Sequence, residues 1–319
     1  MYIILSHLTL KSYSFVYLLC FEHQFLLSLV LFLKYIFMKK LLLLLFVGLS
    51  FVGCSKKEQK INVRWATYNI RMDTKADSLN AWSYRRDRAC QWIKDNQIDI
   101  FGAQEVLHNQ FEDILERLPN FKGLGVGRED GKQKGEYSAV FYNADKYDAL
   151  DSNTFWLSET PDSIGKKGWD AALPRVVTWG KLKDKKTGKI FMAVNTHFDH
   201  VGVEARKQSA LLIISKIKEI IGEKPAVVTG DFNVDDQSEA YKTITTDEFV
   251  LKDAYKISEN HKGVSYTFHN YGRYPEDRRS KIDFIFVTPQ IRVIETGIPK
   301  EEPGAFLSDH NPHYAVLEF

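Results

Sequence analysis

The chain has 319 residues, and its 43 lysines and arginines against 41 aspartates and glutamates give a formal net charge of +2. Three cysteines are too few for a disulfide framework. Without the four lysines and one glutamate of residues 1–53, the rest of the chain has 39 basic and 40 acidic residues, so its net charge does not indicate binding to long nucleic acids.

Residues 1–53 are rich in Leu, Phe, Ile and Val, which predicts a targeting segment. Met38-Lys39-Lys40, an apolar run and then Cys54 have the layout of a bacterial lipoprotein signal. We therefore expect a true start at Met38, membrane attachment through lipid on Cys54, a polar tether over 54–60, and a lipid-anchored protein on the periplasmic or surface face of the bacterial cell envelope. The alternative is a membrane anchor over 24–53, but lysines interrupt that segment.

The remaining residues, 61–319, contain no Pro/Gly/Ser-rich linker or internal repeat, so we expect one domain. Apolar periodicity predicts helices over 82–95, 108–118 and 203–221. Strand-like runs are more numerous and lie at 62–69, 98–103, 137–142, 175–182, 189–196, 225–230, 281–288 and 313–318. Because strands and helices do not alternate strictly, two sheets packed face to face with helices outside fit better than one doubly wound sheet.

Polar side chains follow several of these apolar runs. Gly230-Asp231-Phe232-Asn233 follows one run, and Ser308-Asp309-His310 precedes the last strand. Carboxylates, carboxamides and imidazoles brought together suit phosphate chemistry, because one group orients water, one donates to a phosphoryl oxygen and one handles a proton. Other runs supply further polar residues of the same kinds, namely Asn69, Glu105, His197, Asp199 and Asp283.

In this order, Asn69, Glu105, His197, the GDFN motif, Asp283 and the SDH motif resemble the endonuclease/exonuclease/phosphatase superfamily, from about residue 62 to the C-terminus. The resemblance implies a DNase I-like four-layer α/β sandwich, with two face-to-face, mostly antiparallel β-sheets flanked by helices and an active-site cleft at one end. The two long irregular stretches, 158–174 and 260–280, should form its rim. The resemblance indicates the fold and the reaction class more reliably than it indicates the substrate.

The resemblance also implies roles for the matching residues. Glu105 is expected to be the principal ligand of Mg²⁺, for which Mn²⁺ can substitute, because hard cations prefer oxygen donors. Asn69 would support this cation, and Asp309 would contact it directly or through water.

The catalytic residues that the resemblance implies are His197, Asp231, Asn233, Asp283 and His310. Asp231 would hold the attacking water, and Asn233 would donate to a phosphoryl oxygen. Asp283 would orient His310, which deprotonates the water or stabilises the phosphoryl charge. His197 would donate to phosphate or protonate the leaving oxygen.

A further set is expected to bind the substrate or to support the residues that do, namely Arg71, Glu136, Tyr137, Arg175 and Asp199. The alternative for such strand-edge charges is an ordinary surface ion pair.

Together these features predict a monomeric, Mg²⁺-dependent phosphoesterase, with a phosphodiesterase favoured. Its substrate class stays open between nucleic acid, lipid and small phosphoesters. The alternative is a non-catalytic envelope lipoprotein that uses the same fold to bind a ligand or partner. A non-catalytic protein of this kind would be expected to have lost catalytic residues, whereas every catalytic position of the family pattern is occupied here. Activity on a panel of phosphoesters discriminates the two.

Overall fold

The computed structural model describes residue 24 and residues 26–41, 60–246 and 251–319, and the chain divides into two units, Met1–Gln59 and Lys60–Phe319. In the first unit, residues 26–41 are helical and their side chains are exposed. Within the described ranges, no helix is both long enough and apolar enough to cross a membrane. The predicted lipid attachment at Cys54 lies outside them and stays a prediction.

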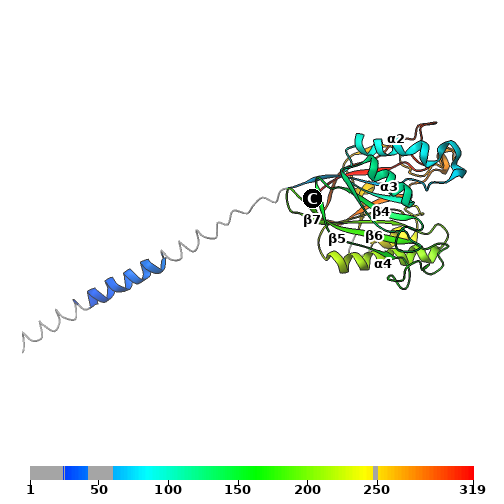
Figure 1. The fold of residues 1–319 in the computed structure, drawn as a ribbon. Helices are drawn as coiled ribbons and strands as arrows, with labels where there is room; N and C mark the ends of the chain where they lie inside the picture. Colours follow the sequence, from blue (N-terminus) through cyan, green and yellow to red (C-terminus); the bar gives the residue numbers. More distant parts are fainter. Residues whose placement is uncertain (1–23, 25, 42–59, 247–250) are drawn as a thin grey trace, which may run out of the picture. The chain divides into compact units, whose positions relative to one another are not determined.

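Two mixed β-sheets form the second unit (Figure 1). In spatial order, the seven-stranded sheet contains β10 (His261–Gly263), β12 (Arg292–Ile298), β13 (His313–Glu318), β1 (Asn62–Asn69), β2 (Ile100–Val106), β4 (Tyr137–Asn143) and β3 (Phe121–Leu124). The six-stranded sheet contains β5 (Tyr147–Trp156), β6 (Val176–Asp184), β7 (Ile190–His197), β8 (Ala226–Asp231), β11 (Asp283–Val287) and β9 (Lys252–Asp253). Three neighbouring pairs are parallel, namely β1 with β2, β7 with β8 and β10 with β12.

The two sheets pack face to face through the apolar side chains on their inner faces. Trp65 and Ile100 of the seven-stranded sheet belong to one buried cluster with Phe191, Val227 and Ile285 of the six-stranded sheet. Because successive side chains of a strand point to opposite faces, the neighbours of these residues are directed outward, where helices cover them.

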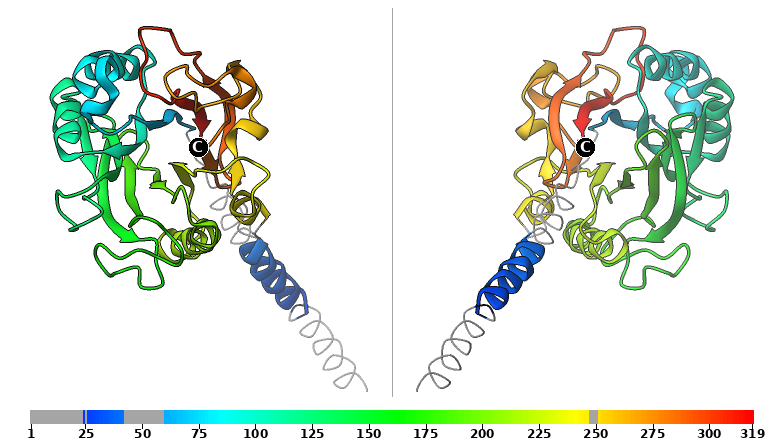
Figure 2. Two further views of the ribbon diagram at one scale, coloured as in Figure 1. Left: turned by 90° about the vertical axis from the view of Figure 1, so that its right-hand side faces the viewer. Right: turned by 90° about the vertical axis from the view of Figure 1, so that its left-hand side faces the viewer.

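The longer helices of the second unit lie on the outer faces of the sheets, as the views in Figure 2 show. On the seven-stranded sheet, α2 (Trp82–Asp95) and α3 (His108–Arg117) bury Cys90, Ile93 and Ile114 against Tyr68 and Phe101. On the six-stranded sheet, α4 (Val203–Ile221) and α5 (Glu239–Thr246) form another cluster. The order helix, sheet, sheet, helix confirms the four-layer sandwich. The remaining short elements are η1 (Lys75–Asn80), α6 (Ala254–Ile257) and η2 (Glu276–Arg278).

The three predicted helices are confirmed, and so are the eight predicted strands, with small shifts of their ends. The sequence patterns missed β3, β5, β9, β10, β12, α5, α6, η1 and η2. Of these, β10 and η2 lie within the stretch 260–280 that was expected to be irregular. In β5, most side chains between Tyr147 and Phe155 are exposed, so this edge strand has no apolar alternation and exists because it pairs with β6.

Strand direction places the motif residues at one end of the sandwich. The parallel pairs bring their C-terminal ends together, so Asn69 lies beside Gln104 and His197 beside Asp231. β11 runs antiparallel to β8, and its first residue, Asp283, pairs with Asp231.

The segments that lead into β4, β6 and β13 reach the same end, because each of these strands runs antiparallel to a neighbour. Tyr137 pairs with Val106, and Val177 pairs with Thr196. Glu136, Arg175 and the SDH motif are thereby carried to the ends of β2, β7 and β1.

Candidate active site

A cavity of about 350 Å³ lies at this end of the sandwich. Its walls are formed by Arg71, Met72, Glu105, Glu136, Leu173, Arg175, His197, His200, Asp231, Asn233, Phe268, Ile282, Asp309 and His310. Leu173 and Phe268 come from the two irregular stretches that were expected to form the rim. Three more predicted residues, Asn69, Asp199 and Asp283, lie behind the walls, and each is hydrogen bonded to a residue that lines the cavity.

Asn69 links two of the carboxylates. Its Nδ2 donates to Glu105 Oε1 at 3.1 Å and to Asp231 Oδ2 at 2.9 Å, while its Oδ1 accepts from the backbone N–H of Arg71 at 2.9 Å. The side chain is completely buried. Asn69 therefore fixes the positions of the Glu105 and Asp231 carboxylates, at the ends of β2 and β8, relative to each other.

Arg71 lies between two carboxylates of the cavity wall. Its Nη1 is 3.6 Å from Glu105 Oε2, and its Nε is 4.0 Å from Asp309 Oδ2. Arg71 and Glu105 have φ angles of 58° and 61°, which non-glycine residues rarely adopt. Such backbone strain is concentrated at functional sites, and here it occurs where two strands end in site residues.

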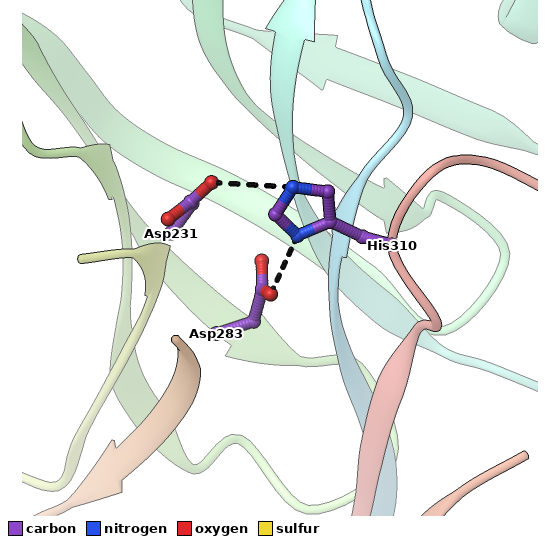
Figure 3. A group of neighbouring side chains, drawn as sticks. All are labelled: Asp231, Asp283 and His310. Carbon is purple, nitrogen blue, oxygen red and sulfur yellow. Dashed lines mark hydrogen bonds and ion pairs between the residues drawn. The ribbon is translucent and has the colours of Figure 1, made fainter. Parts of the chain in front are cut away.

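His310, Asp283 and Asp231 form a buried cluster (Figure 3). His310 Nδ1 lies 2.8 Å from Asp283 Oδ2, and Nε2 of the same ring lies 3.8 Å from Asp231 Oδ2. Burial lowers the pKa of His310, but the charge of Asp283 and its hydrogen bond outweigh this effect and raise the pKa. Burial and the neighbouring Asp283 carboxylate raise the pKa of Asp231.

Asn233 and His197, which both line the cavity, contact each other. Asn233 Nδ2 is 3.0 Å from His197 Nε2 and also donates to the carbonyl of Phe198 at 3.0 Å. Burial and the charges of Arg175 and Arg128 lower the pKa of His197, so its ring is neutral at pH 7. With the amide placed in this way, both Nδ2 hydrogens of Asn233 are engaged, and donation to a phosphoryl oxygen requires one of these partners to be exchanged.

Two sets of residues offer ligands for a cation. Asp231, Asp283 and His310 each present one ligand atom within 4.8 Å of the others, but a cation there would displace the proton shared by His310 and Asp283. Glu105 and Asp309 present carboxylates to the cavity, and Arg71 lies within 4.0 Å of both.

One predicted residue lies elsewhere. The hydroxyl of Tyr137 donates to the carbonyl of Lys132 at 2.8 Å, and its ring belongs to the core beneath α3. The reason is strand alternation, because adjacent residues point to opposite faces and Glu136 is the one that faces the cavity.

Phe268 belongs to the stretch 260–280 that was predicted as rim, whereas no sequence pattern pointed to Arg128. Arg128 makes a bidentate pair with Glu136 at 2.7 and 2.8 Å, and the ring of Phe268 packs 4.8 Å from that of His310. Neither residue belongs to a motif. Phe268 reaches the cavity wall, and Arg128 reaches Glu136 behind it, only when the loops that carry them close over the strand ends.

Known proteins are similar to this chain in fold and in sequence. A model of the endonuclease/exonuclease/phosphatase family matches residues 66–310. The solved endonuclease/exonuclease/phosphatase from Bacteroides vulgatus is 65% identical, with a TM-score of 0.80 over 81% of this chain and 98% of that one. The mannosyl-6-phosphatase from Bacteroides thetaiotaomicron is 39% identical, with a TM-score of 0.74 over 81% of this chain and all of that one.

Among curated sequences, the uncharacterized protein L388 of Acanthamoeba polyphaga mimivirus is 29% identical over 215 residues, which are 64% of this chain and 80% of that protein. The family match extends from β1 to His310 and includes every strand end that supplies the cavity. The chain therefore belongs to the endonuclease/exonuclease/phosphatase family, whose members are phosphoesterases.

Proposed function

We propose that this protein is a metal-dependent phosphoesterase. The observation that carries the proposal is the convergence of three groups in one cavity, which are the His310–Asp283 pair, the neighbouring Asp231 and a separate pair of carboxylates from Glu105 and Asp309.

The carboxylates of Glu105 and Asp309 suit Mg²⁺ or Mn²⁺. Hard divalent cations take oxygen ligands, and Mg²⁺ uses one or two carboxylates and keeps several waters. Asn69 supports this set from behind by its hydrogen bond to Glu105. A divalent cation at this position would neutralise charge on the phosphoryl oxygens.

Asp231, which Asn69 links to Glu105, is placed to orient and deprotonate the attacking water. Its Oδ1 is held by the backbone N–H of Asn233 at 2.9 Å, and its Oδ2 by Asn69. A carboxylate whose pKa is raised by burial is a stronger base than an exposed one. His310, kept as an imidazolium by Asp283, stabilises the negative charge that develops on the phosphoryl group.

The identity of the phosphoester has two candidates. The first is a phosphodiester, which the sequence motifs favour. A phosphomonoester is the second candidate, because the 39% identical structure from Bacteroides thetaiotaomicron is a mannosyl-6-phosphatase and aligns over its whole length.

The test is hydrolysis of a panel of phosphomonoesters, nucleic acids and phospholipids with Mg²⁺ by residues 55–319. We expect hydrolysis of at least one class, and loss of it in Asp231→Asn. The matched control is Asp235→Asn, because Asp235 is exposed in the same segment and does not line the cavity. If the intact protein hydrolyses no phosphoester, the binding-protein alternative replaces this proposal.

A further inference from the structure

We propose that Arg175 selects phosphomonoesters, because its guanidinium binds the third terminal oxygen that a monoester has and a diester lacks. This inference rests on the proposed function and names the substrate class for the same cavity. The observation that supports it is the set of hydrogen bonds made by the Arg175 side chain.

Asp199 is the residue that holds Arg175. Its two carboxylate oxygens accept hydrogen bonds from four backbone N–H groups, and Oδ2 also accepts from Arg175 Nε at 3.3 Å. The carboxylate thus binds the guanidinium through Nε, and neither terminal nitrogen, Nη1 or Nη2, donates to it. Those four N–H groups belong to Ala172, Leu173, Val201 and Gly202.

The terminal nitrogens of Arg175 have little else to bind. Nη2 lies 3.1 Å from His200 Nδ1, and Nη1 is buried without a hydrogen-bond partner among the residues that the structure describes. The side chain is 5% exposed and forms part of the cavity wall. A buried N–H without an acceptor is unfavourable, and an anionic oxygen in the cavity would satisfy it.

Arg128 is a buried arginine of the same region whose two terminal nitrogens both have a hydrogen-bond partner. Its two terminal nitrogens form a bidentate pair with Glu136, and Arg128 does not line the cavity. Of these two buried arginines, Arg175 is the one that lines the cavity and has a donor without a partner among the described residues.

The chemistry of the two ester classes explains the selectivity. A phosphomonoester has three terminal oxygens and a charge of roughly −1.5 to −2 at pH 7, whereas a diester has two terminal oxygens and one charge. A cation held by Glu105 and Asp309, together with His310, would serve two of these oxygens. Arg175 serves the third, and a second ester substituent at that position would face a desolvated guanidinium instead of water.

The experiment compares kcat/KM for p-nitrophenyl phosphate and bis-p-nitrophenyl phosphate in wild type, Arg175→Lys and Arg175→Met. We expect the ratio of monoester to diester hydrolysis to fall roughly ten- to a hundredfold, the range for one lost hydrogen bond to a charged group. Arg175→Lys keeps the charge but loses the planar fork, and it tests the proposal if Arg175→Met does not fold. Arg279→Lys is the matched control, since Arg279 is an ion-paired arginine outside the cavity, with a side chain that is 9% exposed.

Calorimetric binding of inorganic phosphate in the presence of Mg²⁺ gives a readout that needs no turnover. Affinity about tenfold lower or more in Arg175→Lys, and unchanged in Arg279→Lys, supports the inference. Equal losses on both esters, or unchanged phosphate affinity, would overturn it and leave the proposed function standing. Conversely, phosphate binding that depends on Arg175 in a protein that hydrolyses no ester would support the anion site and overturn the proposed function.

Discussion

His310 donates through Nδ1 to Oδ2 of Asp283 at 2.8 Å, and the two side chains are only 4% and 1% exposed. Asp283 begins β11, while His310 lies in the loop before β13, so the contact joins the two sheets. It directs Nε2 of His310 toward Asp231. A hydrogen bond so well shielded from water fixes the orientation of the imidazole ring.

The first prediction follows from this pair. His310→Ala and Asp283→Asn should each lower turnover by roughly 10²-fold or more, the order expected for a lost acid, base or electrostatic group. The double variant should be little slower than His310→Ala alone, because residues that act as a unit cannot be removed twice. Single-turnover hydrolysis measures this, with folding checked by circular dichroism. Additive losses would contradict the pairing, and the exposed Asp277→Asn in η2 is the control.

The second prediction concerns the cation. Mg²⁺ should raise the thermal unfolding midpoint of the wild-type protein, because a ligand that binds only the folded state stabilises it. Glu105→Gln should lose this response and most activity while unfolding near the wild-type midpoint without metal. Activity should vanish in EDTA and return with Mg²⁺ or Mn²⁺.

Glu112→Gln, an exposed change on α3, should keep both the Mg²⁺ response and activity. Full turnover in chelator, or an unchanged Mg²⁺ response in Glu105→Gln, would remove Glu105 from the metal site.

The third prediction is a pH dependence of stability. His313 is completely buried between Thr296 Oγ1, at 2.7 Å, and the carbonyl of Asp283. Burial and Lys281 lower its pKa to about 3. Below pH ~6.5 the unfolded chain therefore binds a proton that the folded protein takes up only near pH 3, so stability falls as the pH drops through this window.

Urea denaturation between pH 6 and pH 4 measures this effect. His313→Asn should be less stable at pH 7, yet its free energy of unfolding should fall less steeply with acid, by up to about 1.4 kcal/mol per pH unit. The exposed His261→Asn serves as the control. An unchanged slope in His313→Asn would show that His313 is not responsible.

The fourth prediction concerns the membrane anchor. The full chain expressed in a bacterium should incorporate labelled palmitate and sediment with membranes, because Cys54 follows a basic and then an apolar segment. Cys54→Ser should lose the label and become soluble, whereas Cys90→Ala should keep the label, since Cys90 is buried in α2. Label that persists in Cys54→Ser would place the anchor elsewhere.

The sequence alone was sufficient for the fold class and for most of the cavity wall. Asp231, Asn233 and His197 follow apolar runs, and a polar residue at the end of a buried strand is visible as a break in the hydrophobic pattern. The i, i+3, i+4 stripe of α4 likewise specified a helix packed on the core.

Tertiary structure decided the contacts that no local pattern encodes. The register of β8 against β11 sets Asp283 opposite Asp231, and the Asp199 carboxylate contacts Nε of Arg175, so one of its terminal nitrogens has no hydrogen-bond partner among the described residues. Strand alternation separated Glu136 from Tyr137, although the two are adjacent in sequence. The periodicity of a sequence indicates which side chains are buried. Hydrogen-bond partners depend instead on how loops far apart in sequence close over the strand ends. The positions of those loops are set only when the two sheets pack together.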